Sequence, residues 1–177
     1  MKVLKFVALG LVAVIALTVV VGLCLPRDWS AERSIVIQAP PEKIHVWIES
    51  PAKWKEWFDF SGMGEMEVSV SGPASGVGAM YTWTSPASKG QMTIAESDPK
   101  TGIRVDEAIE SDTINAHSSI LYTVESGGTR VTWTDKGDPD ALPIVIGGLF
   151  RGMLNASLGE AFEIGLANLK SKVEAAK

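Results

Sequence analysis

The chain from residue 28 onward alternates apolar and polar positions and then changes to helical spacing. In residues 28–40, DWSAERSIVIQAP, the odd positions from 29 to 37 share one face and are apolar except for Arg33. Such alternation predicts a half-buried strand. Pro40 and Pro41 end the strand, and the fixed φ of Pro41 suits the first turn of a helix. We therefore expect a strand followed by a helix from about residue 41.

Two short amphipathic helices are expected between residues 41 and 58. Ser50-Pro51 separates them, so they should meet like the arms of a V. The first has three apolar residues at i, i+3 and i+4, and the second has three aromatic residues at the same spacing: Ile44, Trp47 and Ile48, then Trp54, Trp57 and Phe58. Both helices should present aromatic side chains inward.

The segment from Glu67 to Lys136 has the sequence pattern of strands joined by short turns. Turn sequences such as SGPASGVG, DPKTG and ESGGT recur about every dozen residues, which favours an antiparallel meander. Six strands are predicted here, at 66–71, 77–84, 90–97, 103–110, 115–125 and 129–136. With the first strand, the predicted sheet has seven strands.

The C-terminal segment carries one long apolar stripe. Its residues recur at intervals of three or four and predict a long amphipathic helix: Phe150, Leu154, Leu158, Phe162, Leu166, Leu169 and Val173. The same helix holds Gly148, Gly152, Gly159 and Gly165, each costing about 1 kcal/mol relative to alanine. The glycines either widen a cavity next to the sheet or permit close helix packing.

This order of elements predicts an α+β fold in which a sheet wraps around a helix. A curved seven-stranded antiparallel sheet wraps around the long C-terminal helix, and the two short helices after the first strand close one end. Such a shape leaves a cavity between helix and sheet, and the tryptophans of the short helices become its lid and wall.

An apolar run precedes the domain. Residues 6–25 are apolar or small except Thr18, and as a helix they would span about 30 Å, the thickness of a bilayer core. This run fits two interpretations, a cleaved signal peptide and a retained anchor. We favour an anchor, because Leu23 and Leu25 stand where a peptidase requires small residues. The chain then divides into an anchor, 1–26, and a soluble domain, 27–177.

Charge and cysteine content narrow the function. Lys2 and Lys5 precede the apolar run with no acidic residue, so we expect a single pass through an inner membrane with the domain in the periplasm or outside. The remainder carries a formal charge of −7, and no basic cluster is present to bind nucleic acid. Cys24 is the single cysteine, and no spacing predicts a metal site or a cofactor.

Four stretches carry a resemblance to a known family: ERSIVIQAPPEKIHVWI with the following W..W, GVGAMYTW, GGTRVTWTDKGD and FEIGLANLKSKVE. They resemble the SRPBCC superfamily, and most closely its polyketide cyclase/dehydrase and lipid-transport branch, related to START domains. The resemblance covers residues 29–175 and implies the helix-grip fold. Within it, Trp47 and Trp57 look like the family's helix aromatics and Trp133 like its last-strand tryptophan.

The resemblance implies a deep cavity for lipids, sterols, quinones or polyketides, in carriers, cyclases or hydrolases. We expect a membrane-tethered protein that binds or transports a hydrophobic small molecule or lipid. The alternative is a cyclase-, dehydratase- or hydrolase-like enzyme with the same cavity, and whether the chain is an enzyme stays open. A third hypothesis is a domain with a filled core that meets a protein partner through exposed Trp54 and Trp57.

Strand alternation and the resemblance together predict ten cavity-lining residues: Trp57, Tyr81, Trp83, Met92, Ile94, Glu107, His117, Trp133, Leu158 and Phe162. Glu107 shares a face with Val105 and Ile109, and a buried carboxyl with polar partners could act as a general acid or base. His117 points either to the cavity or to solvent. His45 lies off the apolar stripe of its helix and is expected at the surface.

Overall fold

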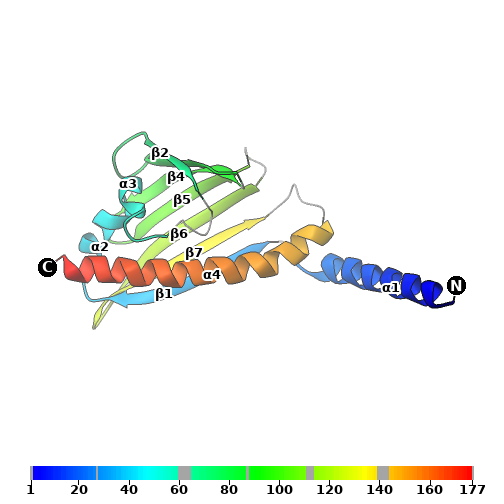
Figure 1. Ribbon diagram of the computed structural model, residues 1–177. Helices are drawn as coiled ribbons and strands as arrows, with labels where there is room; N and C mark the ends of the chain where they lie inside the picture. The colour runs from blue at the N-terminus through cyan, green and yellow to red at the C-terminus, as the bar shows by residue number, and fades with distance from the viewer. Residues whose placement is uncertain are drawn as a thin grey trace.

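The computed structural model describes residues 2–26, 28–59, 65–86, 88–110, 114–138 and 144–176. Within these residues an N-terminal helix precedes one strand, two short helices, six strands and a long helix (Figure 1). The elements are α1 Lys2–Cys24, β1 Trp29–Ile37, α2 Pro41–Ile48, α3 Pro51–Trp54, β2 Glu67–Ser71, β3 Met80–Thr84, β4 Lys89–Asp98, β5 Gly102–Ile109, β6 Ile114–Glu125, β7 Gly128–Asp138 and α4 Ile144–Ala175.

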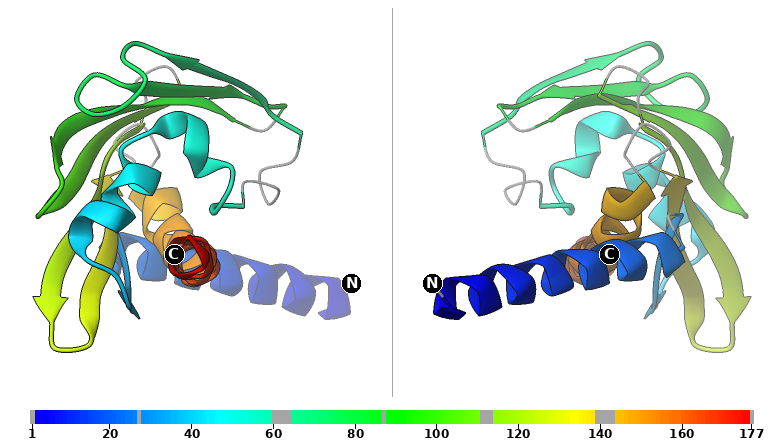
Figure 2. Two further views of the ribbon diagram at one scale, coloured as in Figure 1. Left: turned by 90° about the vertical axis from the view of Figure 1, so that its left-hand side faces the viewer. Right: turned by 90° about the vertical axis from the view of Figure 1, so that its right-hand side faces the viewer.

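The seven strands that the described residues form make one antiparallel sheet in the order β1-β7-β6-β5-β4-β3-β2. Seen along α4, the sheet arches over the helix, and α2 and α3 lie under the arch at one end (Figure 2). This confirms the predicted helix-grip fold. The strand that was expected from residue 77 begins at Met80, because Gly76 and Gly78 have positive φ and form a turn there.

The C-terminal half of α4 packs on the concave face of the sheet. Its predicted stripe is buried at Phe162, Leu166, Leu169 and Val173, each no more than 4% exposed. Phe150 and Leu154 lie outside the residues whose side chains are described. The ring of Phe162 stacks on Trp133 of β7 with 4.1 Å between centroids and 13° between planes.

Two of the α4 glycines permit close packing and do not widen a cavity. A Cβ at Gly165 would lie 2.8 Å from the ring of Phe58 and 3.3 Å from that of Trp133. A Cβ at Gly159 would collide with the Arg33 guanidinium. At these two positions the cavity-widening interpretation is wrong, because side chains already fill the space that a methyl group would need.

Helix α1 projects from the end of the domain where α4 begins (Figure 1). Within the described residues, Lys5–Cys24 is the one helix long and apolar enough to cross a membrane, with a mean hydropathy of 2.9. Its side chains are almost all exposed, so the domain does not bury it. A membrane anchor and a signal sequence both fit this helix.

The turn between β6 and β7 offers a matched pair of glycines to test the sheet. Gly128 has φ of 142°, and a Cβ there would collide with the Ile37 carbonyl oxygen, whereas Gly127 faces open space. We expect Gly128→Ala to destabilise the protein by about 2 kcal/mol or more, and Gly127→Ala to change stability by less than about 0.5 kcal/mol. Denaturant unfolding of both variants measures the difference, and equal values would contradict this packing of β7 on β1.

Candidate binding cavity

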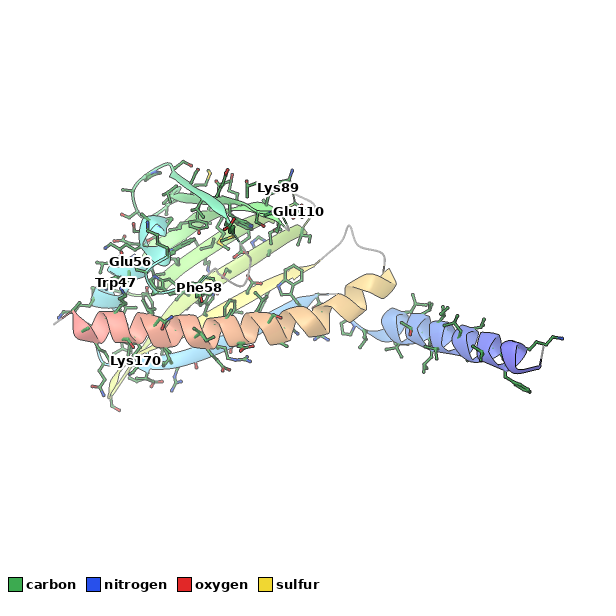
Figure 3. All side chains as sticks on the ribbon, viewed as in Figure 1. Trp47, Glu56, Phe58, Lys89, Glu110 and Lys170 are labelled. Carbon is green, nitrogen blue, oxygen red and sulfur yellow. The ribbon has the colours of Figure 1, made fainter. Side chains whose placement is uncertain are left out.

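A cavity of about 450 Å³ lies between the concave face of the sheet and α4. The described residues that line it come from six strands, the β3–β4 turn, α4 and the segment after α3: Trp29, Phe58, Trp83, Ser88, Met92, Glu107, Ile109, Glu110, Ile114, Ser118, Trp133, Asp135, Leu158 and Phe162. Figure 3 shows Phe58 beside α4 and Glu110 at the end of the β4–β5 pair that is nearer to α1. The cavity therefore lies toward the end of the sheet where the chain leaves α1.

A smaller hollow of about 40 Å³ continues the cavity toward α3. The two share five lining residues, and the smaller one adds Trp54 and Trp57 as its far wall. Trp54 Nε1 donates to the Ile48 carbonyl at 2.7 Å, and Trp57 Nε1 donates to the Trp47 carbonyl at 3.1 Å. These carbonyls are at the C-terminal end of α2, where a helix leaves acceptors without intrahelical donors. Both indoles thus close the cavity and hold α3 against α2.

Two carboxyl groups face the cavity from strands on either side of β6. Glu107 of β5 is 8% exposed and Asp135 of β7 is 5% exposed, and their carboxyl groups are hydrogen-bonded to each other. Trp29 Nε1 donates to Asp135 Oδ1 at 2.6 Å. Gly137 makes room for this indole, because a Cβ there would collide with the Trp29 ring. The first strand is thereby joined to the last strand through a buried hydrogen bond.

The carboxyl pair shares one proton. Two carboxylates in contact inside a protein cannot both ionise, and a hydrogen bond between them requires a proton. Burial, and next the neighbouring Asp135, raise the pKa of Glu107 well above its ordinary value. Burial also raises the pKa of Asp135, but the hydrogen bonds from Trp29 and Glu107 oppose that rise. The pair therefore holds one proton between its two carboxyl groups and carries one negative charge.

Two further polar side chains of the wall, Trp133 and Ser118, are hydrogen-bonded within it. Trp133 Nε1 donates to Ser118 Oγ at 2.9 Å, and Ser118 Oγ donates to the Thr134 carbonyl at 3.3 Å. Because these bonds run within the wall, Trp133 presents its ring to the cavity. The carboxyl pair is then the main polar feature among aromatic and aliphatic side chains.

The structure places most of the predicted residues around this hollow. Six line the main cavity, namely Trp83, Met92, Glu107, Trp133, Leu158 and Phe162, and Trp57 lines the smaller hollow. Tyr81 and Ile94 face inward and are buried in the core, but they are not among the lining residues. Tyr81 packs on Trp54 instead, with 5.7 Å between ring centroids.

His117 requires a correction. Its side chain is 76% exposed on the convex face, where Nδ1 lies 2.9 Å from Asp106 Oδ1. In β6 the neighbouring residues Ala116 and Ser118 are buried, so the strand alternation turns His117 outward. The alternation was read correctly, but the wrong face was assigned to the cavity.

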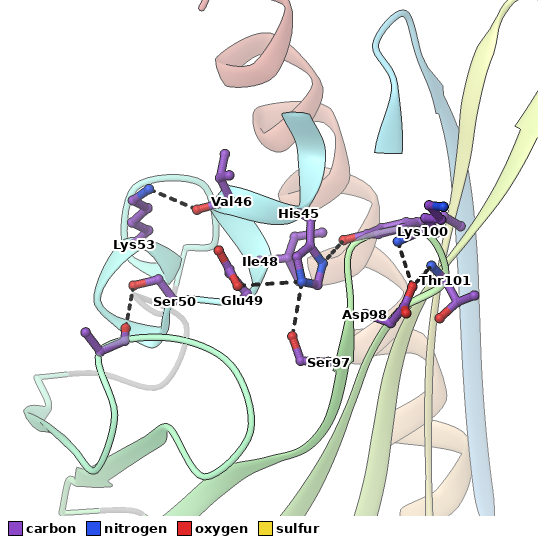
Figure 4. Close-up of polar contacts among 12 residues, drawn as sticks. His45, Val46, Ile48, Glu49, Ser50, Lys53, Ser97, Asp98, Lys100 and Thr101 are labelled. Atoms are coloured by element: carbon purple, nitrogen blue, oxygen red, sulfur yellow. Dashed lines mark hydrogen bonds and ion pairs between the residues drawn. The ribbon is translucent and has the colours of Figure 1, made fainter. Parts of the chain in front are cut away.

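His45 requires the opposite correction, because it is 4% exposed. Its ring nitrogens lie 3.3 Å from the Tyr122 hydroxyl and 3.1 Å from Ser97 Oγ, with Glu49 3.6 Å away (Figure 4). Burial lowers the pKa of His45 despite the nearby Glu49 carboxylate. Helix α2 has two buried sides: one carries its apolar stripe, and the other carries His45 and packs against the sheet. His45 is a structural residue outside the cavity.

Sequence reasoning missed Asp135, Trp29 and Ser118 as residues of the site. A signal for Asp135 was present, because Trp133 was assigned to the cavity and strand alternation places residue 135 on the same face. No local pattern indicates that β5 and β7 bring Glu107 and Asp135 together across β6. Among the described residues, no three His, Cys, Asp or Glu side chains are grouped closely enough to hold a metal ion.

A curved sheet that grips a long helix around an apolar cavity defines the class of helix-grip proteins. The chain belongs to the polyketide cyclase/dehydrase and lipid transport family, whose model matches residues 28–174. Among curated proteins, none matches the chain by sequence.

Solved structures with this fold share little sequence with the chain. Protein CV1439 from Chromobacterium violaceum is 19% identical over 82% of this chain and 97% of its own, with a TM-score of 0.59. StfQ, a di-domain ARO/CYC protein of the steffimycin biosynthetic pathway, is 13% identical over 84% of this chain and 51% of its own, with a TM-score of 0.66. Aha1 from Colwellia psychrerythraea, solved as a dimer, is 18% identical over 84% and 98%, with a TM-score of 0.57. At these sequence identities the similarity shows a shared fold.

The buried carboxyl pair makes stability depend on pH. Because the pKa of Glu107 is raised, the folded state binds more protons than the unfolded state above about pH 4.3, the ordinary value for a glutamate. The free energy of unfolding should therefore fall as pH rises through neutrality. Glu107→Gln removes this titration but keeps a donor toward Asp135, so we expect the variant to lose less stability between pH 5 and pH 8.

Asp106→Asn is the matched control, because Asp106 is the preceding residue on the same strand but is exposed. Denaturant unfolding across this pH range should show the wild-type slope for the control and a shallower slope for Glu107→Gln. Identical slopes for wild type and Glu107→Gln would mean that Glu107 is ionised in the folded protein.

Proposed function

We propose that the domain holds a hydrophobic small molecule or lipid in its central cavity while α1 tethers it to a membrane. The observation that carries the proposal is the cavity of about 450 Å³ with aromatic and aliphatic walls. Ligand sites of drug-sized molecules have this size and composition, with a few polar groups that orient the ligand. The family description, which includes lipid transport, agrees with such a role.

The position of Trp29 supports exchange with the membrane. Trp29 lines the cavity and lies five residues beyond Cys24, the last residue of α1. Five residues span at most about 17 Å, so one wall of the cavity stays near the end of the membrane helix. Lys2 and Lys5 at the N-terminal end support an orientation in which that end is in the cytoplasm and the domain is in the periplasm or outside. Attachment then raises the effective concentration of the domain at the bilayer surface.

Ligand capture tests the proposal with a variant that fills the cavity. Ile109 lines the cavity, whereas Val124 is 71% exposed at the far end of β6. We expect the full chain, purified and transferred to amphipol, to retain an apolar compound that mass spectrometry detects. Ile109→Trp should retain at least about tenfold less of it, because the indole occupies the volume of the ligand. Val124→Trp should retain the wild-type amount, and equal retention by both variants would place the ligand outside the cavity.

An enzyme of the cyclase or dehydratase type is the second candidate. The observation that favours it is the carboxyl pair inside the cavity, where a protonated Glu107 next to an ionised Asp135 could supply an acid and a base. StfQ, described as an ARO/CYC protein, has the same fold. The third hypothesis, an exposed tryptophan patch for a protein partner, loses its basis because Trp54 and Trp57 are 6% and 3% exposed.

Dehydration of a hydrophobic β-hydroxyketone tests the enzymatic candidate. If the pair acts as acid and base, the full chain should accelerate formation of the enone, followed by ultraviolet absorbance, and Glu107→Gln should lose about 100-fold or more of that rate. Asp106→Asn again serves as the control for a carboxylate outside the cavity. An unchanged rate in Glu107→Gln would exclude acid–base catalysis by this residue.

A further inference from the structure

The cavity is acidic as well as apolar. Its described lining includes three carboxyl-bearing residues, Glu107, Glu110 and Asp135, and no lysine, arginine or histidine. Lys89 stands next to the lining residue Ser88, but its side chain is exposed. The described lining therefore offers no positive charge to a bound anion.

Aromatic rings surround the carboxyl pair. Five of the lining side chains are aromatic: Trp29, Phe58, Trp83, Trp133 and Phe162. The face of an aromatic ring attracts a cation, and the attraction is greatest for tryptophan and in sites from which water is removed. Rings and a buried negative charge together form the kind of surface that binds ammonium groups.

The hydrogen bonds of the carboxyl pair also favour an ammonium group over an anion. The carboxyl groups of Glu107 and Asp135 share a proton in their hydrogen bond, and Trp29 Nε1 donates to Asp135 Oδ1. The donors of this cluster are therefore used within it, and what it offers to a ligand is acceptor oxygens and one negative charge. A carboxylate or phosphate head would be repelled and would find no donor here. An ammonium head would instead donate hydrogen bonds to the carboxyl oxygens.

We propose that the cavity selects a hydrophobic molecule with a cationic amine head, and that it discriminates against carboxylates of the same chain length. The amine lies against the Glu107–Asp135 pair and the surrounding rings, and the alkyl or ring portion fills the apolar part of the cavity. This inference rests on the proposed binding function and names the class of ligand for that same cavity.

Three probes of equal chain length test the selection: octylamine, octanol and octanoate. The full chain is placed in phosphatidylcholine nanodiscs, and equilibrium dialysis at pH 7 measures bound probe, with empty nanodiscs to subtract partitioning into lipid. We expect octylamine to bind at least about tenfold more tightly than octanoate, with octanol between them. Octanoate binding as tightly as octylamine, or octanol equal to octylamine, would overturn the inference.

A double substitution tests the role of the pair directly. Glu107→Gln with Asp135→Asn removes the buried charge with little change of shape, and the ratio of octylamine to octanoate affinity should fall about tenfold or more. Asp106→Asn removes one carboxylate from the convex face and should leave the ratio unchanged. A double variant that unfolds cooperatively yet keeps the wild-type ratio would exclude the pair as the selective group. If the double variant does not fold, the order of the three probe affinities for the wild-type protein still tests the inference.

Failure of the inference differs from failure of the proposed function. If no probe binds above the empty-nanodisc control, whatever its head group, the cavity is not a binding site for apolar molecules. If probes bind in an order other than amine, alcohol, carboxylate, the cavity binds apolar molecules but the carboxyl pair does not select them.

Discussion

The stack of Trp133 on Phe162 is the contact that sets the distance between α4 and the sheet. The two rings are nearly parallel with 4.1 Å between centroids, and Gly165, one turn further along α4, admits the ring of Phe58 on the same side. From this point to the C-terminus the helix stripe is buried against the sheet. Toward its N-terminus, Leu158 is half-buried and borders the cavity. The hollow is thus a consequence of where the close aromatic contact lies along the helix.

The polar feature of the cavity belongs to the sheet. Glu107 and Asp135 lie on β5 and β7, and the strand between them contributes Ser118 and Ala116 on the same face. Burying two carboxyls is unfavourable unless one is neutral and both are hydrogen-bonded. The shared proton and the Trp29 donor meet that condition. The cluster is thus hydrogen-bonded within the sheet while it also faces the open volume of the cavity.

Much of the fold could be predicted from the sequence, because the patterns that indicate strands and helices are local. Alternation located the strands within a few residues, and it turned Glu107 inward with Val105. The same alternation gave only two choices of face for each strand, and at His117 the wrong one was chosen. His45 was misplaced for a different reason: a helical stripe marks one buried side, while α2 is covered on two. The pairing of Glu107 with Asp135 depends on strand order across the sheet, which no local pattern contains.

The first strand links α1 to the polar centre of the cavity. Trp29 opens β1, five residues after α1 ends, and its indole is held flat on the sheet by the space at Gly137 while its nitrogen donates to Asp135. The hydrogen bond requires β1 to keep its register beside β7, in which Trp29 pairs with Gly137. A shift of β1 by one residue would turn the indole to the convex face and leave Asp135 without its donor. The pairing of β1 with β7 therefore fixes the position of Trp29 and gives the Asp135 carboxyl its buried donor.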